Sequence, residues 1–180
     1  MQMSEPITTD AAIARFDSLE PATETQMAGR WTGRDIATGH PMDGMLAASY
    51  WYGKRFEGPD AVHPLVHRIP FWGERSVNPG LLPIRLLMAL PLRDTILPLV
   101  VPLIAPLVST ARPRARLRTL SFRGRMHAAM CYDAHPIHDI FAVIDDSTLM
   151  GWMDGRHNTS PHASGRERTA CAIGRGAWPC

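Results

Sequence analysis

The sequence predicts a mainly β protein, an antiparallel barrel or sandwich with one or two short helices and an apolar lid segment. Three observations predict this class. Residues 114–154 contain four short strand patterns separated by tight turns. Residues 29–33 (Gly-Arg-Trp-Thr-Gly) begin an earlier strand with a Trp between two glycines. The 16 prolines and 14 glycines among 180 residues favour short elements over long helices.

Composition narrows the class of protein further. A chain of 180 residues with 45% hydrophobic and 20% charged residues fits one folded domain. Its net charge of +2 is too small to indicate nucleic-acid binding. The N-terminal residues lack the apolar run of a secretory signal, and Cys131, Cys171 and Cys180 have no paired spacing. We therefore expect a cytoplasmic protein with reduced thiols.

The N-terminal third is predicted to contain two short helices around one strand. Residues 1–10 are expected to be a flexible tail, followed by a helix over residues 11–19 that ends before Pro21. The strand at residues 29–36 carries Trp31 on its inward face. Asp43 is predicted to cap a second helix over residues 44–52, with Gly53 after its C-terminus and the basic Lys54 beyond it. Residues 11–77 make up this segment.

Residues 78–113 form an apolar segment with prolines at positions 98, 102 and 106. A membrane-spanning helix needs about 20 apolar residues, and the uninterrupted apolar part here is shorter. The segment is therefore predicted to be an irregular or short-helical lid over the core. The alternative is an exposed apolar flap at residues 95–108 that contacts a membrane surface or guards a ligand portal.

The second half, residues 114–154, reads as an antiparallel meander that completes the barrel. Its strands are expected at residues 114–122, 126–132, 137–144 and 148–153. Residues 155–180 are rich in Gly, Ser, Arg, His and Thr, and are expected to be a disordered or divergent tail. The strand at residues 148–153 would then be left as an unpaired edge.

Several motifs in a fixed order resemble a known family. Residues 29–33, Thr38-Gly-His-Pro41, Asp43-Gly44 and Trp51–Phe56 resemble the small bacterial and fungal GXWXG proteins. Residues 115–118, Arg123-Gly124, Tyr132-Asp133, Asp145-Asp146 and Met153-Asp154 resemble the domain of unknown function that follows in those proteins. The resemblance covers residues 13–154. It implies a lipocalin-like (calycin) barrel in which Gly29, Trp31 and Gly33 are structural and Trp31 packs under a basic side chain.

The densest group of titratable residues lies around the strand at residues 137–144. If Asp139 faces inward with Ile137 and Phe141, its carboxylate lies among apolar residues and its pKa should rise. Asp139 is then a candidate general acid or base, or a ligand anchor. His138 lies on the opposite face and is the second acid–base candidate. An ion pair between Asp139 and one of the arginines at positions 116, 118 and 123 is the competing interpretation.

The leading functional hypothesis is a carrier for a small, mostly apolar ligand. The predicted cavity residues are Met126, Met130 and Phe141, with Tyr132, Asp139 and Arg118 around the polar end of the ligand. The alternative is an isomerase, cyclase or lyase that uses Asp139 or His138 as general acid or base. A third hypothesis is a peripheral membrane-surface protein that acts through residues 95–108. No metal or cofactor is predicted, because the His and Cys residues lack ligand spacing.

Overall fold

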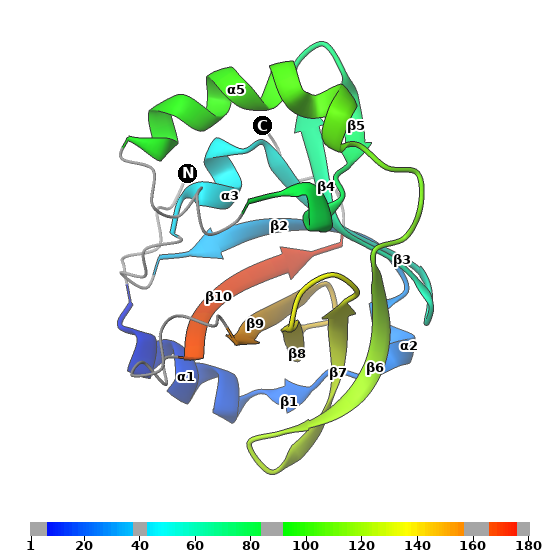
Figure 1. Cartoon of the computed structure of the whole chain (residues 1–180). Coiled ribbons are helices and arrows are strands. Elements are labelled where there is room, and N and C mark those ends of the chain that lie inside the picture. Colours follow the sequence, from blue (N-terminus) through cyan, green and yellow to red (C-terminus); the bar gives the residue numbers. More distant parts are fainter. Residues whose placement is uncertain (1–6, 38–42, 84–91, 157–165, 176–180) are drawn as a thin grey trace.

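The computed structural model describes residues 7–37, 43–83, 92–156 and 166–175, and shows a mainly β protein (Figure 1). The described strands are β1 (Glu20–Pro21), β2 (Gly29–Ile36), β3 (Trp51–Gly58), β4 (Ala61–Ile69), β5 (Gly73–Ser76), β6 (Ala115–Phe122), β7 (Arg125–Tyr132), β8 (Ile137–Asp145), β9 (Thr148–Arg156) and β10 (Arg166–Gly174). The described helices are α1 (Thr9–Ser18), α2 (Glu24–Met27), α3 (Met45–Ala48), the short 3₁₀ helix η1 (Pro79–Leu81) and α5 (Arg93–Val108).

The strands form one antiparallel sheet that closes on itself. Hydrogen-bonded neighbours follow the order β8-β7-β6-β4-β3-β2-β10-β9, and β9 pairs back to β8, so eight strands form a ring. Strands β1 and β5 extend the sheet beside β8 and β4. Alternation along β8 separates two apolar clusters: Phe141 belongs to one, whereas Ile140 and Ala142 pack with Phe16 of α1 in the other. The predicted mainly antiparallel β architecture is confirmed.

Strand β10 corrects the prediction for the C-terminal segment. Residues 166–174 were expected to belong to a disordered or divergent tail. They instead pair with β9 from Arg166↔Arg156 to Gly174↔Thr148 and with β2 from Ala170↔Ile36 to Gly174↔Thr32. The sequence shows only a short run of small and apolar residues there. The backbone N–H and C=O groups of β10 pair with two neighbouring strands, β2 and β9. A pattern of side chains along the segment itself does not indicate this pairing. Strand β9 is therefore not an edge strand.

The GRWTG motif has a structural explanation. Gly29 adopts φ +112°, which side chains rarely allow. Trp31 is buried; its Nε1–H donates to the carbonyl of Met27 at 2.7 Å, and the Arg175 guanidinium lies 4.9 Å from its ring centroid. The ring of Trp51 packs directly on Gly33, where a Cβ would overlap it. A buried Trp beneath a basic side chain is the arrangement that the family resemblance implied.

The predicted helix over residues 44–52 is wrong beyond its first turn. Helix α3 covers only Met45–Ala48, and Gly44 with φ 81°, not Asp43, is its N-cap residue. Tyr50 has a positive φ of 61°, which ends the helical path, and Trp51 begins β3. Near the N-terminus, α1 begins at Thr9 and is capped by the Thr8 side chain, so residues 9–10 are helical rather than tail.

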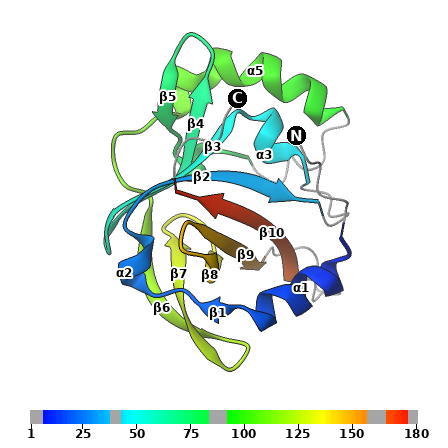
Figure 2. The same cartoon turned by 180° about the vertical axis from the view of Figure 1, so that it is seen from behind.

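Helix α5 contains three prolines and lies across one end of the ring, over α3 (Figures 1 and 2). Pro102 and Pro106 have no N–H, so the carbonyls of Pro98 and Pro102 lose their partners within the helix. The Tyr50 hydroxyl donates to Pro98 O at 3.2 Å, and Trp72 Nε1–H donates to Pro102 O at 2.8 Å. The four-residue proline spacing thus creates acceptors through which the rest of the protein holds α5.

None of the described helices combines the length and the apolar character needed to cross a bilayer.

Candidate functional site

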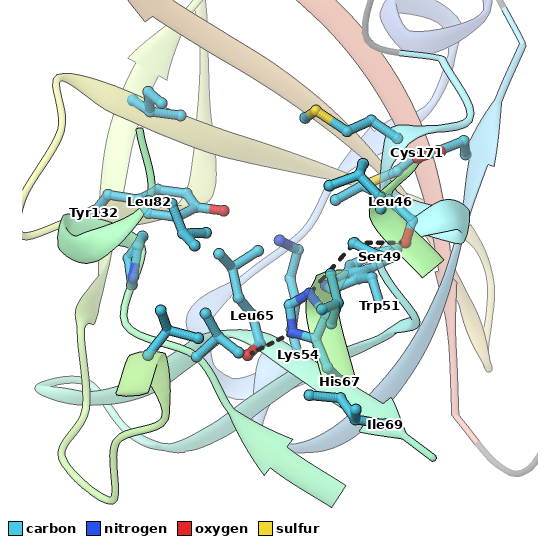
Figure 3. Close-up of a pocket in the computed structure, with 18 of the residues that line it drawn as sticks. Leu46, Ser49, Trp51, Lys54, Leu65, His67, Ile69, Leu82, Tyr132 and Cys171 are labelled. Carbon is cyan, nitrogen blue, oxygen red and sulfur yellow. Dashed lines mark hydrogen bonds between the residues drawn. The ribbon is translucent and has the colours of Figure 1, made fainter. Parts of the chain in front are cut away.

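A cavity of about 170 Å³ lies between α5 and the ring of strands (Figure 3). The α5 side chains that line it are Leu97, Val100, Val101, Ile104 and Val108. Strands, α3 and the η1 region contribute further apolar side chains, among them Leu46, Trp51, Leu65 and Ile69. The polar lining residues are Asp35, Ser49, Lys54, His67, Tyr132, Asp139 and Cys171. The cavity is therefore mostly apolar, with a small set of polar groups that can orient a ligand.

A buried ion pair joins Lys54 of β3 to Asp139 of β8. Lys54 Nζ lies 2.7 Å from Asp139 Oδ2, and the two side chains are only 4% and 7% exposed. Burial alone would lower the pKa of Lys54, but the Asp139 carboxylate raises it above its ordinary value. Lys54 consequently remains an ammonium at neutral pH. It can donate hydrogen bonds but is a poor amine nucleophile.

Tyr132 and Cys171 remain protonated beside this pair. Burial, followed by the nearby Asp139 carboxylate, raises the pKa of Tyr132 above its ordinary value. Burial also raises the pKa of the Cys171 thiol to about 12. Figure 3 shows the Lys54 ammonium and the Tyr132 hydroxyl directed toward the middle of the cavity. The site therefore presents hydrogen-bond donors, and its thiol is not poised for nucleophilic attack.

Asp35 of β2 is a second carboxylate on the cavity wall. Burial raises its pKa to about 6, opposed by backbone N–H groups of Gly44 and Leu46 that hydrogen-bond to the carboxylate at the start of α3. Its Oδ2 atom is buried without a hydrogen-bond partner among the described residues. Asp35 thus combines a fixed orientation with a pKa close to neutral pH, as general acids and bases require.

His67 and Ser49 form a neighbouring polar pair. His67 Nε2 lies 3.4 Å from Ser49 Oγ, and burial lowers the pKa of His67 to about 4, so the ring is neutral at pH 7. The Ser49 hydroxyl donates to Leu46 O at 2.8 Å. Because its hydrogen points at the α3 backbone and not at the imidazole, this pair lacks the geometry of a nucleophile and its base.

The structure brings together only some of the predicted site residues. Asp139 faces the cavity, as the inward interpretation predicted, and Tyr132 lines the cavity beside it. Met130 and Phe141 are fully buried in the core but are not among the residues that line the cavity. The prediction for Met126 is wrong, because its side chain is 58% exposed.

The predicted arginine partners of Asp139 are also wrong. Arg118 pairs with Asp60 at the surface, so it does not reach the polar end of the cavity. Arg116 and Arg123 form surface ion pairs with Asp133 and Asp17 respectively. The actual partner, Lys54, lies on β3. From the sequence, Lys54 was expected just beyond the C-terminus of a predicted helix.

His138 is half-buried on the face of β8 opposite Asp139 and does not line the cavity. Its Nδ1 atom has no hydrogen-bond partner in the described part of the chain. His40 lies outside the described residues. The residues that the structure describes contain no group of three His, Cys, Asp or Glu side chains arranged to hold a metal ion.

Fold and cavity together define a small, mainly β protein with an apolar cavity closed by a helix. Residues 14–69 match the family described as GXWXG protein, and residues 113–164 match a domain of unknown function, DUF4334. The chain belongs to the proteins in which a GXWXG segment is followed by this domain, as the motifs predicted.

A solved structure described as "Crystal structure of protein from Thermomonospora curvata" is similar over most of its length. It shares 27% sequence identity with this chain at a TM-score of 0.68, and the match covers 96% of this chain and 90% of that one. No match was found among curated proteins.

Proposed function

We propose that the protein binds a small, mostly apolar ligand inside a lipocalin-like barrel, with α5 as the lid. The observation that carries this proposal is a largely apolar cavity of about 170 Å³ whose polar groups gather around the Lys54–Asp139 pair. A dry apolar cavity of about 150 Å³ accommodates benzene. The present cavity therefore suits a ligand of about six to ten non-hydrogen atoms.

The charges around the cavity define the polar end of this ligand. Lys54 and Asp139 neutralise each other, while the Tyr132 hydroxyl and the ammonium supply donors. A ligand carboxylate would place a second anion beside Asp139, which is costly in a buried site. An uncharged ligand with one hydrogen-bond acceptor, such as a ketone or an ether, fits this arrangement.

Native mass spectrometry of freshly purified protein, followed by solvent extraction, tests the proposal. The expected result is a copurifying small molecule that Val101→Trp excludes, because the larger ring from α5 fills the cavity. Leu107→Trp is the matched control, since Leu107 lies on the same helix but is 78% exposed. A ligand-free protein that also fails to bind acetophenone would contradict the proposal.

One observation favours an enzyme as the second candidate function. Asp139 is held by Lys54 and His138 does not line the cavity, but Asp35 keeps a buried carboxylate oxygen without a partner among the described residues. Asp35 could take a proton from the carbon beside a ketone and return it to the γ carbon, while Lys54 and Tyr132 stabilise the enolate oxygen. This reaction class is a double-bond isomerisation.

The isomerase candidate is tested with 3-cyclohexen-1-one, by following its conversion to the conjugated ketone. Asp35→Asn should abolish turnover while retaining binding, because the amide oxygen can still accept bonds from the α3 backbone. Conversion by the wild-type protein at the rate of buffer, or full activity of Asp35→Asn, would eliminate this candidate.

A further inference from the structure

Helix α5 is apolar on both of its faces. Residues 95–108 contain no charged side chain. The inner face lines the cavity, whereas Leu99, Leu103 and Leu107 on the outer face are 69%, 78% and 78% exposed. Their four-residue spacing places them along one side of the helix. A surface helix normally carries polar residues on its solvent-facing side. A helix that is apolar on all sides is normally covered by apolar groups on all sides, so the outer face of α5 is expected to contact a second apolar surface.

The apolar surface continues onto the hairpin between β4 and β5. Phe71 at its tip is fully exposed, and the neighbouring Trp72 is 41% exposed. The bond from Trp72 Nε1–H to Pro102 O ties this tip to α5 at 2.8 Å. Figures 1 and 2 show the hairpin beside the helix at the same end of the molecule. We call the five residues Phe71, Trp72, Leu99, Leu103 and Leu107 the docking surface.

We propose that the docking surface binds the surface of an anionic lipid bilayer. Two basic side chains on the flanking strands supply the charge that such a surface attracts. Arg75 is exposed on β5, on the face that it shares with the cavity-lining His67. Arg68 is exposed on the opposite face of β4, where its guanidinium lies 3.9 Å from the Tyr52 ring centroid. The nearby Glu74 is occupied by Arg30. An apolar centre with a basic rim and a Trp at its border is the pattern of proteins that lie in the membrane interface.

Charge also disfavours a second copy of the chain as the occupant. A two-fold dimer presents the same patch from both partners. Two docking surfaces packed face to face would bring the positive charge of Arg75 from each protomer to the same interface. Anionic headgroups attract these positive charges, whereas a second protomer presents the same positive charges and repels them.

The docking surface and the cavity lie on opposite faces of one helix. Leu97, Val101 and Ile104 face the cavity, and the exposed leucines face outward. Bilayer docking would place the lid against the phase in which apolar molecules concentrate. This link to ligand uptake rests on the proposed function, but the docking itself does not. The bonds from Tyr50 and Trp72 to proline carbonyls fix α5 against the rest of the protein.

Cosedimentation with phosphatidylcholine vesicles, with and without phosphatidylglycerol, tests the proposal. The variant L99S/L103S/L107S should lose about tenfold or more in partition coefficient, since each exposed leucine contributes apolar area to the contact. Met126→Ser is the matched control, because Met126 is 58% exposed near the β6–β7 turn, at the end of the molecule away from α5 (Figure 1). The variant R68Q/R75Q should bind mixed vesicles more weakly and with less dependence on salt.

Two results would overturn the proposal: wild-type protein that stays in the supernatant with both vesicle types, or a folded L99S/L103S/L107S protein that binds like wild type. Size-exclusion chromatography with light scattering identifies the competing occupant. A wild-type dimer that the leucine variant makes monomeric, without vesicle binding, would assign the surface to self-association. Because binding of acetophenone to the purified protein is measured without lipid, failure of docking leaves the proposed ligand binding to be judged separately.

Discussion

Replacing Lys54 by Met tests whether the cavity contains a true buried ion pair. The substitution keeps the length of the side chain and removes the charge that lies 2.7 Å from Asp139 Oδ2. An Asp139 carboxylate that is 7% exposed would then be buried without its partner. Breaking a buried pair in this way costs about 3–5 kcal/mol. At about 2–4 °C per kcal/mol for a chain of this length, the melting temperature should fall by about 6–20 °C.

The double variant K54M/D139L supplies the control. Replacing both charges by apolar groups of similar size is often neutral or stabilising, so most of the lost melting temperature should return. Acidification should also narrow the gap between Lys54→Met and wild type, since protonation neutralises the orphaned carboxylate. Circular dichroism melts at about pH 5 and about pH 8 measure both effects. A single variant that loses less than about 1 kcal/mol, or a double variant no better than the single, would refute the reasoning.

Three further predictions concern packing, the lid and pH. Gly33→Ala should destabilise the fold by about 1–3 kcal/mol in a thermal melt, because the new methyl group overlaps a Trp ring; an unchanged melt would contradict this packing. Trp72→Phe should cost about 0.5–1.5 kcal/mol and speed amide exchange in α5, because Pro102 O loses its donor; unchanged exchange would show that this bond does not hold the helix. His67, with its pKa lowered to about 4, stabilises the fold above about pH 6.5 and loses that effect on acidification, whereas Asp35, with its pKa raised to about 6, acts in the opposite sense. Between about pH 6 and pH 4, the free energy of unfolding should therefore fall more for Asp35→Asn than for wild type, and less for His67→Gln. Urea unfolding at several pH values measures this. The same change in free energy with pH in all three proteins would contradict both assignments.

The sequence predicts those parts of the fold that local patterns determine. Residues 29–36 were expected as a strand and form β2, and the alternating pattern after residue 114 yields β6 to β9. Strand β10 escaped prediction because its stability comes from pairing with β2 and β9, two strands distant in sequence from each other. The helix expected over residues 44–52 failed because tertiary pairing of β3 outweighs helical propensity.

The same misassignment concealed half of the candidate site. Placed at the end of a helix, Lys54 looked like a favourable charge near a C-terminus, whereas the strand alternation from Phe56 would have turned it inward. Asp139 was identified as an inward carboxylate only on the condition that Ile137 and Phe141 also face inward. Its partner was not, because contact across the ring depends on closure of the sheet. Asp35 and His67 carried no motif, and their significance arises only from burial beside the cavity.

Isothermal titration with acetophenone and ethylbenzene tests the central claim most directly. The two probes share an aromatic ring and a two-carbon substituent, but only the ketone has an acceptor for Lys54 and Tyr132. A hydrogen bond to a charged group contributes about 1.5–3 kcal/mol, so K54M/D139L should weaken ketone binding by about tenfold or more and leave ethylbenzene binding unchanged. Equal loss for both probes, or no binding of either probe by the wild-type protein, would contradict a cavity that orients apolar ligands through the Lys54–Asp139 pair.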